Sequence, residues 1–146
     1  MSTLTLAQAC TIIDTALAHA RRAGLKPLCV VVLDAGGHML ALKREDQASF
    51  GRPQIATAKA AGCLAMGFGG QEIARRAHER TAFYAALGSV LPQGLLPVRG
   101  GVLILDAAGT LLGAVGVTGD TSENDEACAV AGINAAALTA DAGVAS

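Results

Sequence analysis

The chain has few aromatic residues and no excess of charge of either sign. Of its 146 residues only 3% are aromatic, none is Trp, and the net charge at pH 7 is -1. Proteins that bind nucleic acids neutralise phosphates with clustered Lys and Arg, and many stack bases on aromatic rings. Because this sequence has neither feature, we expect no nucleic-acid partner.

Cysteine motifs and long apolar runs are also missing. The spacing of the four cysteines leaves disulfide pairing open, but without a CxxC or Cys/His cluster we expect reduced, buried thiols and no zinc site. No run of about 18 uncharged apolar residues, as a spanning helix needs, is present. The charged pattern over residues 8–22 is not that of a signal peptide. We therefore expect a cytoplasmic protein without membrane contact.

What the chain does contain is apolar material and an internal repeat. Hydrophobic residues make up 52% of the sequence, enough for one domain over residues 1–146 with a substantial core. Residues 30–42 and 102–114 are nearly alike: an apolar run, then Asp-Ala-x-Gly, then a second apolar run. Asp bonds the turn backbone and Gly supplies a positive φ, which predicts β-hairpins over about 28–44 and 101–118.

Four segments have helical patterns. They are residues 4–23, 53–66, 71–86 and 123–139. The resulting order, α-ββ-αα-ββ-α, predicts an α+β fold in which helices pack on an antiparallel sheet. Both faces of the first strand are apolar, and we expect a second copy of the chain to cover one of them in a homo-oligomer.

Lys59 is the most informative single residue. Its helical neighbours at three and four positions are all small or apolar. Such a lysine is either half-buried and paired with a carboxylate or an anionic ligand, or it extends its ammonium past the core to water.

Two polar stretches in the second half are further candidates. Arg99-Gly100-Gly101 combines a guanidinium suited to carboxylates with glycines that permit close approach, although a loop that needs permissive φ angles has the same pattern. Residues 120–126 are acidic. Ser122 and Asp125 resemble a capping box, and the remaining carboxylates suit a helix start, a divalent cation or acid–base chemistry. Calcium-loop spacing is absent.

The three histidines form no known motif. His19, His38 and His78 lie far apart in the sequence, and neither CxxCH nor HExxH occurs. No metal site is therefore predicted from sequence spacing.

Several stretches, in order, resemble the GlcG/HbpS-like family of small haem-binding and haem-degrading proteins. They are residues 34–46, 58–61, 80–83, 100–102, 113–119 and 125–129. The resemblance implies a three-layer, profilin-like subunit that assembles into dimers or octamers, with a ligand pocket near a subunit interface. The positions that match recurring family positions are His38, Asp46, Lys59, Gly100 and Gly101. Leu103 departs from the family, which commonly has Pro there, and no haem axial ligand carries over.

Three functions follow from these observations. The first is an oligomer that binds haem or a related tetrapyrrole, with Lys59 or Arg99 on the propionates and a histidine or hydroxyl near the iron. The second is a lyase, isomerase or hydrolase acting on an organic acid. The third is a non-catalytic subunit of a partner enzyme. The ligand-binding candidates are His38, Lys59, Arg99, Gly100, Gly101 and Thr118. The catalytic candidates are Asp46, Lys59, Glu123 and Asp125.

Overall fold

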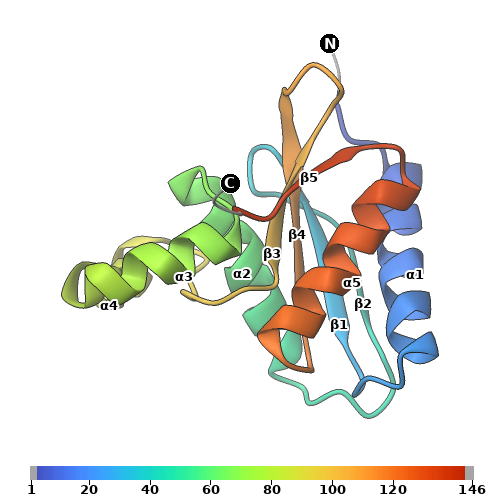
Figure 1. Ribbon diagram of the computed structural model, residues 1–146, viewed down its shortest axis with the longest axis horizontal. Coiled ribbons are helices and arrows are strands. Elements are labelled where there is room, and N and C mark those ends of the chain that lie inside the picture. Colours follow the sequence, from blue (N-terminus) through green and yellow to red (C-terminus); the bar gives the residue numbers. More distant parts are fainter. Residues whose placement is uncertain (1–2, 144–146) are drawn as a thin grey trace.

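The computed structural model describes residues 3–143 as five helices and five strands (Figure 1). In chain order they are α1 (Leu6–Arg22), β1 (Cys29–Asp34), β2 (Met39–Arg44), α2 (Arg52–Met66), α3 (Gly70–Glu79), α4 (Thr81–Val90), β3 (Gly101–Leu105), β4 (Leu111–Thr118), α5 (Ser122–Ala135) and β5 (Thr139–Asp141). The strands form one antiparallel sheet in the order β2-β1-β4-β3-β5. The predicted α+β fold and both predicted hairpins are confirmed.

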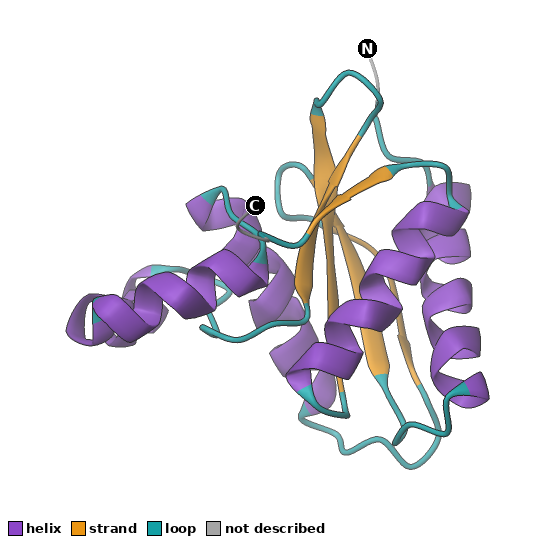
Figure 2. Cartoon of the chain, viewed as in Figure 1, coloured by secondary structure: helices purple, strands orange, loops and turns teal. Residues whose placement is uncertain are grey.

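Helices cover both faces of this sheet, which makes three layers (Figure 2). Val30 and Val32 of β1 pack into one core with α1 and α5. On the other face, Val31 packs with the small residues Ala56 and Ala60 of α2. The expectation that a second copy covers one face of the first strand is therefore wrong, because α2 of the same chain already covers it.

The two hairpin turns have the same geometry. In each, the Asp side chain accepts two backbone N–H groups. Asp34 Oδ1 accepts those of Gly36 and His38, at 2.9 and 3.0 Å. Asp106 Oδ1 accepts those of Ala108 and Thr110, at 2.9 and 2.8 Å. The Gly at the fourth position has a φ of +84° in the first turn and +85° in the second. Asp-Ala-x-Gly therefore forms the turn as predicted: the Asp side chain bonds the turn backbone and the Gly takes the positive φ.

Three local features differ from the sequence prediction. The helix expected over 71–86 is interrupted at Arg80, where φ is -128° and ψ is 60°, so α3 and α4 are separate. A short strand, β5, follows α5. The capping box expected for Ser122 and Asp125 is wrong, since Thr121 caps α5 by accepting the Asn124 N–H at 3.2 Å.

Helices α3 and α4 project from the side of the sheet (Figure 1). Among the elements of residues 3–143, α4 packs only against α3. It carries no charged residue, and two of its large apolar side chains are exposed, Phe83 by 44% and Val90 by 72%. No helix in the described part of the chain has both the length and the apolar character needed to span a membrane.

Candidate functional site

Lys59 lies in the interior and is paired with a carboxylate. Its ammonium donates to the backbone oxygen of Val117 at 3.0 Å and to Asp125 Oδ2 at 3.1 Å. The side chains of Lys59 and Asp125 are only 5% and 1% exposed. Burial raises the pKa of Asp125 above its ordinary value, although the nearby ammonium acts in the opposite direction. Two of the predicted catalytic residues are thus in direct contact.

Gly100 and Gly101 leave the space that Lys59 occupies. A Cβ on Gly100, whose φ is +118°, would lie 2.8 Å from Lys59 Nζ and 2.7 Å from the Val117 oxygen. A Cβ on Gly101 would lie 2.6 Å from the Cys63 sulfur. These two glycines therefore allow helix α2 to pack closely against the backbone before and at the start of β3.

Arg99 is paired with Glu126, a residue that the sequence analysis did not select. Arg99 Nη2 donates to Glu126 Oε2 at 2.6 Å, and this bond raises the pKa of Arg99 above its ordinary value. The other carboxylate oxygen, Oε1, is buried and accepts no hydrogen bond from the described residues. Glu126 differs from Asp125, which is also buried, in pairing with Arg99, and a single sequence does not reveal that partner.

The remaining candidates of the acidic run and of β4 lie around this region. Thr118 accepts a hydrogen bond of 2.8 Å from Arg52 Nη1, at the start of α2. Glu123 is exposed in the first turn of α5. Neither is a hydrogen-bond partner of the Lys59 ammonium.

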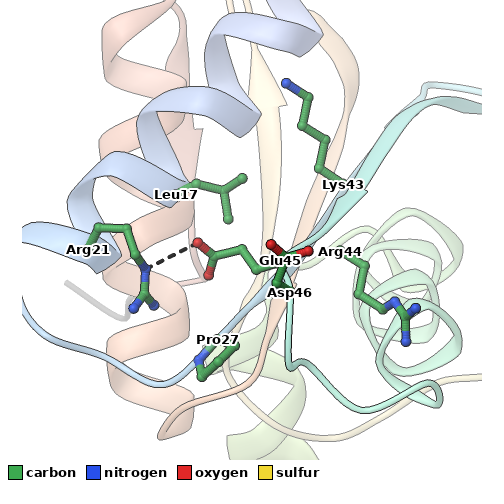
Figure 3. A pocket seen from close by; sticks show the side chains of 7 residues that line it. All are labelled: Leu17, Arg21, Pro27, Lys43, Arg44, Glu45 and Asp46. Atoms are coloured by element: carbon green, nitrogen blue, oxygen red, sulfur yellow. Dashed lines mark ion pairs between the residues drawn. The ribbon is translucent and has the colours of Figure 1, made fainter.

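Asp46 lies elsewhere, at an open cleft of about 560 Å³ beside the end of β2 (Figure 3). The cleft is lined by Leu17, Arg21, Pro27, Lys43, Arg44, Glu45 and Asp46. Arg21 Nε lies 3.1 Å from Glu45 Oε2. The other oxygen of Glu45 accepts the Leu28 N–H at 2.8 Å. Asp46 therefore belongs to a different site from Lys59 and Asp125.

Hydrogen bonds connect the two sites. Asp125 Oδ1 accepts the Asp120 N–H at 3.0 Å, and Asp120 Oδ1 accepts the Lys26 N–H at 3.0 Å. The Lys26 carbonyl in turn accepts from Arg21 Nη2 at 2.8 Å. Bonds from the Asn124 amide and the Lys26 backbone lower the pKa of Asp120 to about 2. The buried ion pair and the cleft thus share one network.

His38 stands at a third place, beside the first hairpin turn. A pocket of about 300 Å³ there is lined by Thr3, Leu4, Asp34, Ala35, Gly36, His38, Leu40, Leu111 and Leu112. The imidazole is 82% exposed, and its Nδ1 lies 3.4 Å from Asp34 Oδ1. With Nδ1 facing the carboxylate, Nε2 is the nitrogen that remains available to a ligand.

Comparison with known proteins identifies the family. A family model described as haem degrading protein HbpS-like matches residues 4–134. The chain belongs to the HbpS-like family. The resemblance based on the order of its motifs is confirmed, and with it the association of the family with haem. No curated protein matched the chain in a sequence search.

Solved structures support the same fold. Klebsiella pneumoniae protein ORFY is 26% identical, with a TM-score of 0.83 and coverage of 94% of this chain and 92% of that one. A double mutant of Streptomyces reticuli HbpS is 27% identical, with a TM-score of 0.78 and coverage of 92% and 87%. A PduOC:heme complex is 24% identical, with a TM-score of 0.84 and coverage of 94% and 98%; at that identity the likeness shows the fold alone.

Proposed function

We propose that this HbpS-like chain binds haem in the pocket beside its first hairpin turn, with His38 as the iron ligand. The observation that carries the proposal is the Asp34–His38 pair at the edge of a leucine-lined pocket. A carboxylate beside one imidazole nitrogen orients the ring and makes the other nitrogen a better metal ligand. Haem supplies an iron that needs such a nitrogen.

The composition of the pocket suits the rest of the haem molecule. Leu40 and Leu111, which are partly exposed, provide an apolar surface for the macrocycle, whereas Leu4 and Leu112 also line the pocket but are mostly buried in the core. The pocket volume of about 300 Å³ is at the lower end of the range for small-molecule sites, and the pocket is open to the surface. The macrocycle is therefore partly held, and we place its propionates toward solvent.

This placement differs from one in which Lys59 or Arg99 binds the propionates. Each of those cations already has a buried carboxylate partner, Asp125 and Glu126 respectively. A propionate that displaced either partner would leave a buried carboxylate without its cation, which is costly. The two pairs are better explained as parts of the fold that supports the site.

We also propose that the chain forms a homo-oligomer through α4. A helix without charged residues that exposes Phe83 and Val90 is typical of an interface rather than of a free surface. Light scattering should therefore give a mass of two or more chains. Val90→Lys should lower that mass, whereas Ala107→Lys, in the exposed turn between β3 and β4, should not; a monomeric wild-type protein would contradict the proposal.

Titration of the purified protein with hemin tests the haem proposal. We expect a saturable Soret band at one haem per chain for the wild-type protein. His38→Ala should weaken binding by tenfold or more and shift the band, because the iron loses its imidazole. His78→Ala, which removes an exposed histidine from α3, is the matched control and should bind as the wild type does. Equal behaviour of both variants, or a band that never saturates, would contradict the assignment.

A further inference from the structure

Helix α4 exposes a row of side chains with the spacing that helices use to pack side by side. Tyr84 is buried and Leu87 packs against the same core, so that face of α4 is covered within the chain. Phe83, Ala86 and Val90 are exposed. They are three and then four residues apart, which places them on one side of the helix in the pattern of a seam between two packed helices. No element of residues 3–143 covers this row.

Arg80 adds a cation at the N-terminal end of the row. It is at the junction of α3 and α4, is exposed, and forms no ion pair with a carboxylate of residues 3–143. Its Cζ lies 4.3 Å from the centre of the Phe83 ring. The guanidinium therefore extends over the first residue of the row, with its charge available to a partner.

The C-terminal end of α4 lacks the hydrogen-bond donors that a helix end needs. Its last turn contains no basic residue. In a continuing helix the Gly88 carbonyl would accept the N–H of residue 92, but Pro92 has none. The last carbonyls of a helix carry a partial negative charge, and arginine side chains can bond to them. The two ends of α4 are thus complementary in charge.

The geometry points to an antiparallel pairing of α4 with α4 of a second copy, about a two-fold axis beside Ala86. This inference rests on the homo-oligomer proposed above and specifies how its two helices meet. Phe83 packs against the partner's Val90, and Arg80 bonds to the C-terminal carbonyls of the partner helix. At 1.5 Å per residue, Arg80 is about 4.5 Å along the axis from Phe83, a distance that an arginine side chain spans.

A parallel pair would not satisfy the same charges. It would bring the two Arg80 guanidinium groups together at one end and leave both C-terminal ends without a cation at the other. An antiparallel pair makes each favourable contact twice, because a two-fold interface presents the same residues from both copies. The partner that complements α4, an uncharged apolar row with a cation at one end only, is α4 itself.

Cysteine cross-linking tests the arrangement in a Cys10→Ser background, which removes the partly exposed native thiol. Ala86→Cys protein should form a disulfide-linked dimer on mild oxidation, because residue 86 lies beside the axis. Phe83→Cys and Val90→Cys proteins should each stay unlinked, since two copies of either residue lie about 10 Å apart along the axis. After subunit exchange, an equimolar mixture of these two proteins should form linked heterodimers, because residue 83 faces residue 90.

Variants of Arg80 test the charge contact separately. Arg80→Ala should raise the Kd of assembly about tenfold in sedimentation velocity, since the contact is lost twice in each pair. Arg80→Lys keeps the cation and should restore most of the affinity. Arg22→Ala removes an exposed cation from the last turn of α1 and is the matched control, which should assemble as the wild type does.

Three results would overturn the inference. Linkage of Phe83→Cys protein to itself would indicate a parallel pair. An assembled protein in which neither Ala86→Cys nor the mixture cross-links would show that α4 contacts a different surface of the second copy. Equal effects of Arg80→Ala and Arg22→Ala would remove the charge contact. In each case, if Val90→Lys still dissociates the oligomer, the α4 interface stands and only its antiparallel geometry is wrong; a monomeric wild-type protein contradicts both.

Discussion

The ammonium of Lys59 lies 3.1 Å from the Asp125 carboxylate, and this pair joins the two helical layers of the fold. Lys59 comes from α2, on one face of the sheet, and Asp125 from the first turn of α5, on the other. They meet at the end of β4, where the Val117 carbonyl accepts a second hydrogen bond from Lys59. This buried ion pair therefore links the helix layer on one face of the sheet to the helix layer on the other.

Removing one member of this pair should destabilise the protein strongly. Lys59→Met leaves the Asp125 carboxylate buried without its cation, and we expect a loss of about 3–5 kcal/mol in the free energy of unfolding. Urea denaturation at pH 7 measures it. The double variant Lys59→Met/Asp125→Leu should recover much of the loss, because no buried charge remains. A single variant as stable as the wild type would contradict this account of the pair.

Gly100→Ala should show how tightly the loop before β3 fits Lys59. Its new Cβ would lie within 2.8 Å of Lys59 Nζ, in addition to the cost of the left-handed backbone. Gly109→Ala is the matched control, since its φ is +85° and nothing lies within 4 Å of the Cβ position. We expect the control to cost about 1–2 kcal/mol and Gly100→Ala at least about 1 kcal/mol more, measured by denaturation. An equal loss of stability in the two variants would show that the loop before β3 moves away from Lys59 without cost.

The stability of the protein at acidic pH should depend on Asp120. Its hydrogen bonds lower the pKa from 3.8 to about 2, so the folded state favours the charged form. The stability this provides is present above pH 3.8 and is lost as the pH falls towards 2. Asp120→Asn should therefore flatten the decline of the unfolding free energy over that range. An unchanged decline would show that other carboxylates control it.

Asp125 contributes to the pH dependence of the unfolding free energy with the opposite sign. Burial raises its pKa, so the stability linked to it is fully present below pH 3.8 and is lost as the pH rises through the higher folded-state value. It cannot account for a loss of stability in acid, which comes from carboxylates whose pKa is lowered, such as Asp120 and Glu72, each to about 2.

The four thiols should differ sharply in reactivity. Burial raises the pKa of Cys63 to about 12, and those of Cys29 and Cys128 to about 11, whereas Cys10 is partly exposed. Since the thiolate is the reactive form, Ellman's reagent at pH 8 should titrate one thiol per native chain and four after unfolding in guanidinium. Rapid reaction of two or more thiols in the native protein would contradict this burial pattern.

The hairpins were predictable because their information is local. Asp34 and Gly37 determine the first turn through contacts within five residues, and the equivalent residues do so in the second. The burial of Lys59 was also indicated by the small, apolar residues around it on α2. Its partner was not, because Asp125 is 66 residues further along the chain and reaches Lys59 only through the topology of the sheet.

The features that sequence reasoning missed are set by tertiary contacts or by very short segments. β5 has three residues, too few to show an alternating pattern, and it forms by pairing with β3. The break at Arg80 has no Gly or Pro to mark it. The second apolar face of β1 was assigned to another copy because the packing of α2 against it depends on small residues such as Ala56 and Ala60.

The crystal structure of the protein loaded with hemin would test the central claim most directly. The account predicts that the iron is bound by Nε2 of His38, with Asp34 still facing Nδ1 and the macrocycle against Leu40 and Leu111. Haem in the cleft beside Asp46, or anywhere with His38 unligated, would contradict it.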